Sequence, residues 1–254
     1  MMFIDTHVHL YDEVFAEDRD LMIQKAIDAG VGKLYMPNCD STTIEGMLAI
    51  EAAWKDRCFA MMGLHPVYVK ENFEEELGIV SGWLERRKFS AIGEVGLDKY
   101  WDLTYLEQQK EAFRRQIDLA AQYDLAVIIH SREATQDCID IIREKQSGNL
   151  RGIFHCFSGT IEEARQVTEL GFHLGIGGVV TFKKSNLPEI IAETDLEYLV
   201  LETDAPYLAP VPYRGKRNES SYIPLIADKV AIVKQLPLEE VARVTTENAQ
   251  KIFR

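Results

Sequence analysis

The sequence is poor in cysteine and has no long apolar run. Its four cysteines lie far apart and form no C-x-x-C pair, which argues against a disulfide framework and favours reduced thiols. No window approaches the about 18 consecutive apolar residues of a membrane-spanning helix. The apolar run at the N-terminus is broken at once by Asp5, unlike a signal peptide. We therefore expect a cytoplasmic protein that does not associate with membranes.

Basic residues are in the minority. The chain has 28 Lys and Arg against 41 Asp and Glu, a formal net charge of −13. This excess of acid argues against a broad basic surface for binding long nucleic acid. It does not exclude a polyanionic substrate that metal ions hold locally. With 46% hydrophobic and 27% charged residues, the composition is that of a globular chain and not of a disordered one.

The chain also has no Pro/Gly/Ser-rich linker and no low-complexity tract, so we treat residues 1–254 as one domain. Eight short apolar or β-branched runs alternate with polar loops and stretches of helical spacing. We expect strands at Phe3–His7, Lys33–Met36, Ala60–Leu64, Ala91–Glu94, Ala126–His130, Gly152–His155, Phe172–Gly175 and Leu199–Glu202. A closing helix has Ile223, Ile226, Ala227, Val230 and Val233 on one face, and we expect Pro237 to end it.

Strands and helices that alternate along a whole chain predict parallel pairing with crossover helices. Eight such units favour the α/β class and a single-domain (β/α)₈ TIM barrel. An open doubly wound sheet is the alternative. It predicts a glycine-rich phosphate loop after an early strand, and the segment "HVHLYDEVF" is not one.

Histidines and isolated carboxylates stand where the predicted strands end. In a barrel, this end of the strands carries the active site. Five of the six histidines fall there, together with two carboxylates; the residues are His7, His9, His65, Glu94, His130, His155 and Asp204. Random placement would scatter these side chains over both ends of the fold.

These side chains can together form a metal site. Four imidazoles (His7, His9, His130, His155) and the two carboxylates provide enough ligands for two divalent ions about 3.5–4 Å apart, which can activate a water between them. We expect Glu94 to bridge the ions and Asp204 to bind one of them and accept the proton of the attacking water. Each residue also has a structural interpretation, as a hydrogen-bonded histidine, a helix cap or a turn residue. If the cluster had no function, all of these structural interpretations would have to be true at the same time.

Several segments resemble those of the TatD family of metal-dependent deoxyribonucleases, within the amidohydrolase-like hydrolases. They are "DTHVHL", "GLHP", "GEVGLD", "VIIHSREA", "FHCFSG" and "ETDAPYLAP…YRGKRNE", in the family's order. The resemblance implies a (β/α)₈ barrel with a two-metal centre that hydrolyses DNA phosphodiesters from an end. It also implies that His7, His9, Glu94 and Asp204 hold one metal, that Glu94, His130 and His155 hold the other, and that His65 contacts the substrate phosphate.

Cationic and aromatic residues near the same strand ends are candidates for holding substrate. The basic loop "YRGKRN" contains Arg214, Lys216 and Arg217, and Arg132 follows His130. Guanidinium groups match phosphate oxygens. Tyr100, Trp101 and Tyr207 could stack on bases. Together with the negative net charge, these residues favour single-stranded or frayed DNA ends and oligonucleotides as substrates over long duplex DNA.

We expect the two divalent ions to be Mg, Mn or Zn. We also expect a monomer without an obligate protein partner. Two other functions remain open. One is a hydrolase that uses the same metal pair on a C–N or ester bond of a small molecule. The other is a metal-binding protein without catalysis, in which replacing Asp204 would leave function unchanged.

Overall fold

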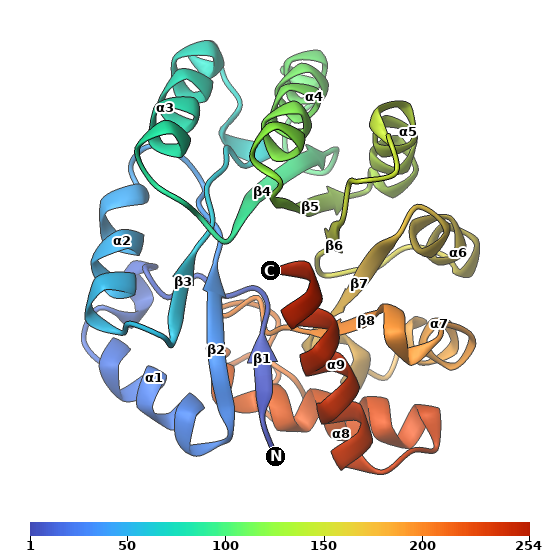
Figure 1. The fold of residues 1–254 in the computed structure, drawn as a ribbon. Helices are drawn as coiled ribbons and strands as arrows, with labels where there is room; N and C mark the ends of the chain where they lie inside the picture. The colour runs from blue at the N-terminus through green and yellow to red at the C-terminus, as the bar shows by residue number, and fades with distance from the viewer.

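The computed structural model describes residues 1–254 and confirms the α/β barrel. Eight strands surround one axis, and helices cover them on the outside (Figure 1). The strands are β1 Phe3–Asp5, β2 Val31–Met36, β3 Cys58–Ala60, β4 Ala91–Asp98, β5 Ala126–Arg132, β6 Gly152–Phe154, β7 Phe172–Ile176 and β8 Leu199–Leu201. The helices are α1 Arg19–Asp28, α2 Ile44–Ala53, α3 Phe73–Arg86, α4 Leu106–Tyr123, α5 Thr135–Lys145, α6 Ile161–Glu169, α7 Leu187–Glu193, α8 Ile223–Lys234 and α9 Leu238–Ile252.

The strands form two parallel sheets, β1-β2-β3 and β4-β5-β6-β7-β8. No continuous ladder joins the two sheets. Instead, the bridge Met62–Ile92 connects the β3 side to β4, and the bridge Val8–Ala205 connects the segments that follow β1 and β8. Both junctions adjoin residues that the sequence places in the candidate site.

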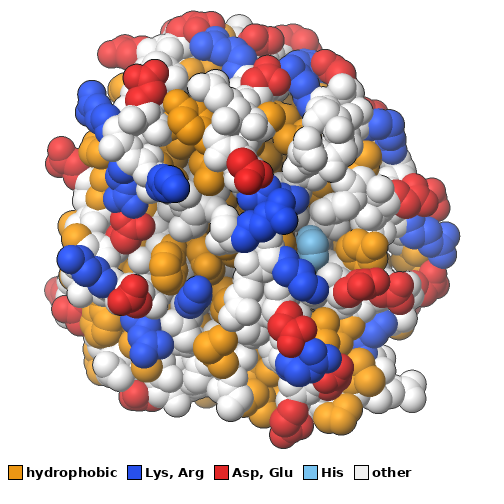
Figure 2. Space-filling view, in the orientation of Figure 1, with side chains coloured by type: hydrophobic (Ala, Val, Ile, Leu, Met, Phe, Trp, Pro, Cys, Tyr) orange, Lys and Arg blue, Asp and Glu red, His pale blue; other side chains and the backbone are white.

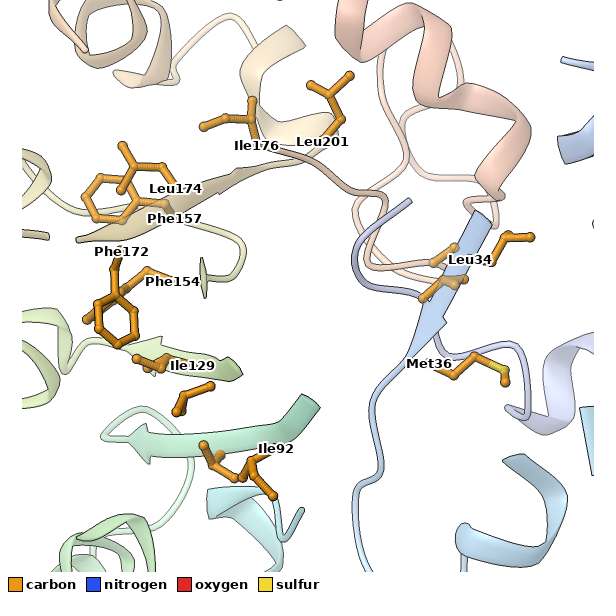
Figure 3. Packing of buried hydrophobic residues seen from close by; sticks show 14 of the residues in the cluster. Leu34, Met36, Ile92, Ile129, Phe154, Phe157, Phe172, Leu174, Ile176 and Leu201 are labelled. Atoms are coloured by element: carbon orange, nitrogen blue, oxygen red, sulfur yellow. The ribbon is translucent and has the colours of Figure 1, made fainter. Parts of the chain in front are cut away.

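The two-residue period of the strands divides the core into two clusters. Side chains on one set of faces pack against the surrounding helices in a large cluster, which includes Phe154, Phe172 and Leu174 on β6 and β7 (Figure 3). Alternate side chains such as Ile4, Ile128 and Val200 form a small cluster inside the barrel, together with residues of α9. The interior of the barrel is therefore filled by side chains at the height of these residues.

Helix α9 covers one end of the barrel. Ala249 and Ile252 belong to the interior cluster, and the ring of Phe253, just beyond the helix, stacks on Tyr35 of β2 at a centroid distance of 3.7 Å. Figure 1 shows α9 across the end that faces the viewer, and Figure 2 shows cationic and acidic side chains intermixed on this side. The other end of the barrel is left for the functional site.

Several predicted boundaries were wrong by a few residues. The third strand is Cys58–Ala60 and not Ala60–Leu64, so the chain is already irregular when it reaches His65. The helix that begins at Ile223 ends at Lys234, because Gln235 takes a left-handed conformation with φ of 55°. Pro237 does not end that helix but precedes α9. None of the helices is long and apolar enough to cross a membrane, and all four cysteines are free.

A bulge in β4 sets the direction of Glu94. The β4–β5 register pairs Ile92 with Val127 and Val95 with Ile129, so Gly93 and Glu94 together oppose Ile128. A Cβ atom on Gly93 would lie 2.7 Å from the Cβ of Ile128, and only glycine fits there. Bulges re-aim side chains beside functional sites. Glu94 therefore lies within a strand that continues to Asp98, and not at the strand's end as predicted.

Candidate metal centre

Seven predicted side chains come together at the barrel end opposite α9. His7 and His9 follow β1, His65 follows β3, Glu94 lies in β4 and His130 in β5, His155 follows β6, and Asp204 follows β8. Their side-chain nitrogen and oxygen atoms lie within a few ångströms of one another. Residues nearly two hundred positions apart thus form one cluster.

Glu94 lies at the centre of this cluster and divides its contacts between its two oxygens. Its Oε2 lies 3.0 Å from Nε2 of His7 and 3.6 Å from Nε2 of His9. Its Oε1 lies 2.8 Å from Nδ1 of His130 and 3.0 Å from Nε2 of His155. His65 also faces Oε1, at 3.3 Å. The side chain is only 2% exposed, so these five imidazoles provide its surroundings.

The first group of donors is His7, His9, Glu94 and Asp204. The two Nε2 atoms are 3.3 Å apart, and Oδ1 of Asp204 lies 3.4 Å from His9 and 3.8 Å from His7. Four ligands about 2.1 Å from a zinc ion in a tetrahedron are separated by about 3.4 Å. The separations of 3.0–3.8 Å around His7 and His9 are close to this value, and His7, His9 and Glu94 together have the spacing of a cation site.

The second group of donors faces the other oxygen of Glu94. It contains the predicted His130 and His155. His65, for which the resemblance implies a contact with substrate phosphate, lies beside them and faces the same oxygen. His155 also lies close enough to His7 and Asp204 to share an ion with them. The His155 ring also stacks on His7 at 3.7 Å, so the two groups are adjacent. Imidazole and carboxylate donors together suit Zn, Fe and Ni through nitrogen, and Mg and Mn through oxygen.

The electrostatics of the centre favour an ionised Glu94. Burial by itself raises the pKa of this carboxyl, but the imidazoles of His155, His65 and His7 outweigh burial and hold the pKa well below its usual range. Burial lowers the pKa of His7, and the neighbouring His155 lowers it further. A buried carboxylate surrounded by imidazoles with ring nitrogens aimed at it is an arrangement that a cation stabilises.

Three of the histidines have a neighbour on the far side of the ring that sequence reasoning missed, whereas Nδ1 of His7 is buried without a hydrogen-bond partner. Oδ2 of Asp98 lies 2.9 Å from Nε2 of His130, and Oε1 of Glu202 lies 3.4 Å from Nδ1 of His155. The hydroxyl of Tyr11 lies 2.8 Å from Nδ1 of His9 and donates to the carbonyl of Pro37. Such partners fix the orientation and tautomer of a metal ligand. The signal was present, since "GEVGLD" and "LETDAPYL" each contain a second carboxylate.

Asp5 joins the segments that carry His7 and Asp204. Its carboxylate accepts hydrogen bonds from the hydroxyls of Thr203 and Ser220, both at 2.6 Å, and from the backbone N–H of His7 at 3.3 Å. Complete burial raises its pKa to about 7, against these hydrogen bonds. Asp5 therefore ties the end of β1 to the loop after β8.

The predicted cationic residues have different surroundings. Arg217 forms a two-pronged ion pair with Asp18, at 2.9 and 2.6 Å, and also donates to the carbonyl of Val14. These contacts tie the loop to the segment before α1, and a contact of Arg217 with phosphate stays a prediction. Arg214 lies over the ring of Phe182, and Lys216 is exposed. Arg132 lies over Tyr100, beside the centre.

Known proteins resemble this chain over its whole length. A family model described as TatD related DNase matches residues 4–254. The chain belongs to this family. It is 40% identical over 254 residues to YabD of Bacillus subtilis, an uncharacterized metal-dependent hydrolase, covering 100% of this chain and 99% of the relative. It is 32% identical over 255 residues to an Erwinia tasmaniensis protein named 3'-5' ssDNA/RNA exonuclease TatD, with 98% of each chain covered.

Solved structures agree as well. The crystal structure of the TatD homologue YjjV from Escherichia coli superposes with a TM-score of 0.93 at 31% identity, covering 99% of this chain and 97% of that one. An Entamoeba histolytica TatD family hydrolase superposes with a TM-score of 0.86 at 23% identity, which supports the fold. The chain is thus a metal-dependent hydrolase of the TatD family.

Proposed function

We propose that this protein hydrolyses phosphodiester bonds at the ends of single-stranded DNA, with two divalent metal ions in the centre built around Glu94. The observation that carries the proposal is the position of this carboxylate, whose two oxygens face two different groups of donors. The exonuclease name of a relative that is 32% identical supports nucleic acid as the substrate class.

The candidate metal ligands form two sets that share Glu94. His7, His9, Glu94 and Asp204 would hold one ion, and Glu94, His130 and His155 the other. When bound, such ions neutralise charge on phosphoryl oxygens and lower the pKa of water. His65 contacts the same oxygen of Glu94 and lies where it can meet a substrate phosphate. Because Glu94 belongs to both sets, it would hold the two groups of donors next to each other.

Asp204 is the proton acceptor in this proposal. Burial raises the pKa of its carboxyl, but the hydrogen bond from His9 and the charges of His155 and His7 bring the pKa below its usual value. The side chain is 15% exposed, more than Glu94, so it meets the incoming water and substrate. An ionised carboxylate at the open side of the centre can take the proton of an attacking water.

The net charge of −13 limits the kind of nucleic acid. A long duplex requires many phosphate contacts from Lys and Arg, and the structure uses Arg217 internally. A short end that meets the metal centre directly needs only local cations.

The test is hydrolysis of end-labelled single-stranded oligodeoxynucleotides by protein loaded separately with Mg, Mn or Zn, with metal content measured on the same samples. We expect stepwise shortening from one end. A carboxyl ester, an amide and a cyclic ureide serve as competing substrates. No shortening by the metal-loaded protein, with cleavage of one of the small molecules, would overturn the nuclease and support a small-molecule hydrolase.

A further inference from the structure

The loop that follows β4 is fixed at several points. Oδ1 of Asp98 accepts the backbone N–H groups of Tyr100 and Trp101 at 2.9 and 3.0 Å. Lys99 pairs with Asp137 of α5, and Lys70 binds Asp102 at 3.2 Å. The backbone of this loop is therefore held in place without the help of its aromatic side chains.

Those aromatic side chains stay in solvent. Tyr100 is 50% and Trp101 65% exposed, and neither belongs to the hydrophobic core. The two rings meet edge to face at 4.9 Å. The guanidinium carbon of Arg132 lies 3.7 Å from the ring centre of Tyr100 and 5.4 Å from that of Trp101. We call Tyr100, Trp101 and Arg132 the aromatic shelf.

The aromatic shelf is connected directly to the metal centre. The same Asp98 that holds the loop contacts Nε2 of His130 through its other oxygen at 2.9 Å. Arg132 ends β5, two residues after His130.

We propose that the aromatic shelf binds the unpaired terminal base of a single-stranded nucleic acid, and that Arg132 receives the adjoining phosphate. This inference rests on the proposed function and names the part of the substrate that the site selects. Aromatic rings stack on any base whose face is free, and a guanidinium that lies flat on a ring still presents its N–H groups to phosphate oxygens. Bases inside a duplex have both faces covered, so the aromatic shelf selects frayed or single-stranded ends.

The first experiment measures binding with a chelator present, so that no cleavage occurs. A fluorescein-labelled single-stranded hexamer is titrated with protein and followed by anisotropy, beside hexamers that carry an abasic nucleotide at the 3′ or the 5′ end. We expect one abasic end to weaken binding about tenfold. Trp101→Ala and Tyr100→Ala should weaken binding of the intact hexamer to a similar degree and remove the discrimination, while Trp101→Phe should retain most of it.

Matched controls lie away from the aromatic shelf. Arg86 lies over Trp83 at 5.5 Å in α3, which makes Arg86→Gln the counterpart of Arg132→Gln. Ile232→Ala removes a 62% exposed apolar side chain from α8. Both controls should bind the hexamer as the unaltered protein does. The variant sites are exposed, so circular dichroism and thermal unfolding should stay unchanged.

The outcomes separate the two proposals. If the protein shortens DNA but the shelf variants bind and discriminate normally, the aromatic shelf is overturned and the nuclease stands. If the protein binds the hexamer through the aromatic shelf but cleaves no nucleic acid, the proposed hydrolysis falls and the binding site stands. If it neither binds nor cleaves, both are overturned, and a protein partner becomes the better explanation for the exposed rings.

Discussion

The carboxylate of Asp98 lies 2.9 Å from Nε2 of His130, on the side of the ring opposite to Glu94. The other ring nitrogen, Nδ1, lies 2.8 Å from Oε1 of Glu94. A charged acceptor at Nε2 keeps the proton on that nitrogen and leaves Nδ1 with a lone pair directed into the centre. Asp98 is therefore a positioning residue, although it faces away from the donor groups.

Asp98→Asn should weaken metal binding by about 10- to 100-fold. An asparagine that keeps its oxygen on the N–H groups of Tyr100 and Trp101 turns its NH₂ group toward Nε2 of His130. The proton then moves to Nδ1, where it opposes coordination. Competition with a fluorescent chelator measures the change. The exposed Asp140, which pairs with Arg143, gives the control Asp140→Asn, and equal affinities for both variants would contradict the role of Asp98.

The sequence predicted the barrel and the clustering of its histidines, because both follow from short-range patterns. Period-two strands and helical stretches are visible locally, and parallel strands bring their C-terminal ends together whatever their separation along the chain. The prediction of side-chain direction was less accurate where a shift of one residue along a strand changes the side to which a side chain points. Glu94 was expected at a strand end, but a bulge that requires Gly93 aims it inward from within β4.

Contacts between distant segments were not predictable. Glu202 behind His155 depends on how β8 lies beside β7, and the ion pair of Arg217 with Asp18 joins positions 199 residues apart. A cationic loop in the sequence looks the same whether its arginine meets a phosphate or an aspartate. Charge patterns therefore identified the loop but not which of its cations is free.

Asp204→Asn should reduce kcat by more than about a hundredfold and leave KM for an oligonucleotide within a few-fold. The reason is that the amide retains an oxygen near His9 but cannot take a proton at neutral pH. Steady-state kinetics, with metal content determined on each sample, check this. The exposed Asp195 provides the control Asp195→Asn. Unchanged kcat in a variant that retains its metal would contradict the role of Asp204 as the proton acceptor.

Gly175→Ala should destabilise the metal-free protein by about 1–3 kcal/mol. A Cβ atom there would lie 2.2 Å from Oε2 of Glu202, a fully buried side chain that contacts His155 and accepts the N–H of Cys156. The glutamate has to move, and His155 is then no longer held in its present orientation. Urea unfolding measures the change. Gly82→Ala in α3 is the control, because nothing lies within 4 Å of its added Cβ and alanine is favoured over glycine in a helix. Equal free energies of unfolding for the two variants would show that Glu202 moves aside freely.

His173 should make the fold less stable in mild acid. Burial lowers the pKa of this imidazole to about 4, whereas the unfolded chain has a pKa near 6.5. Between these values the unfolded chain binds a proton that the folded chain does not, so stability is complete above about pH 6.5 and is lost as the pH falls toward 4. At pH 5 the loss is on the order of 1–2 kcal/mol. His173→Gln removes the titrating group, so its urea midpoint should fall less between pH 7.5 and pH 5 than that of the unaltered protein. Equal falls would show that His173 takes up its proton at the same pH in both states.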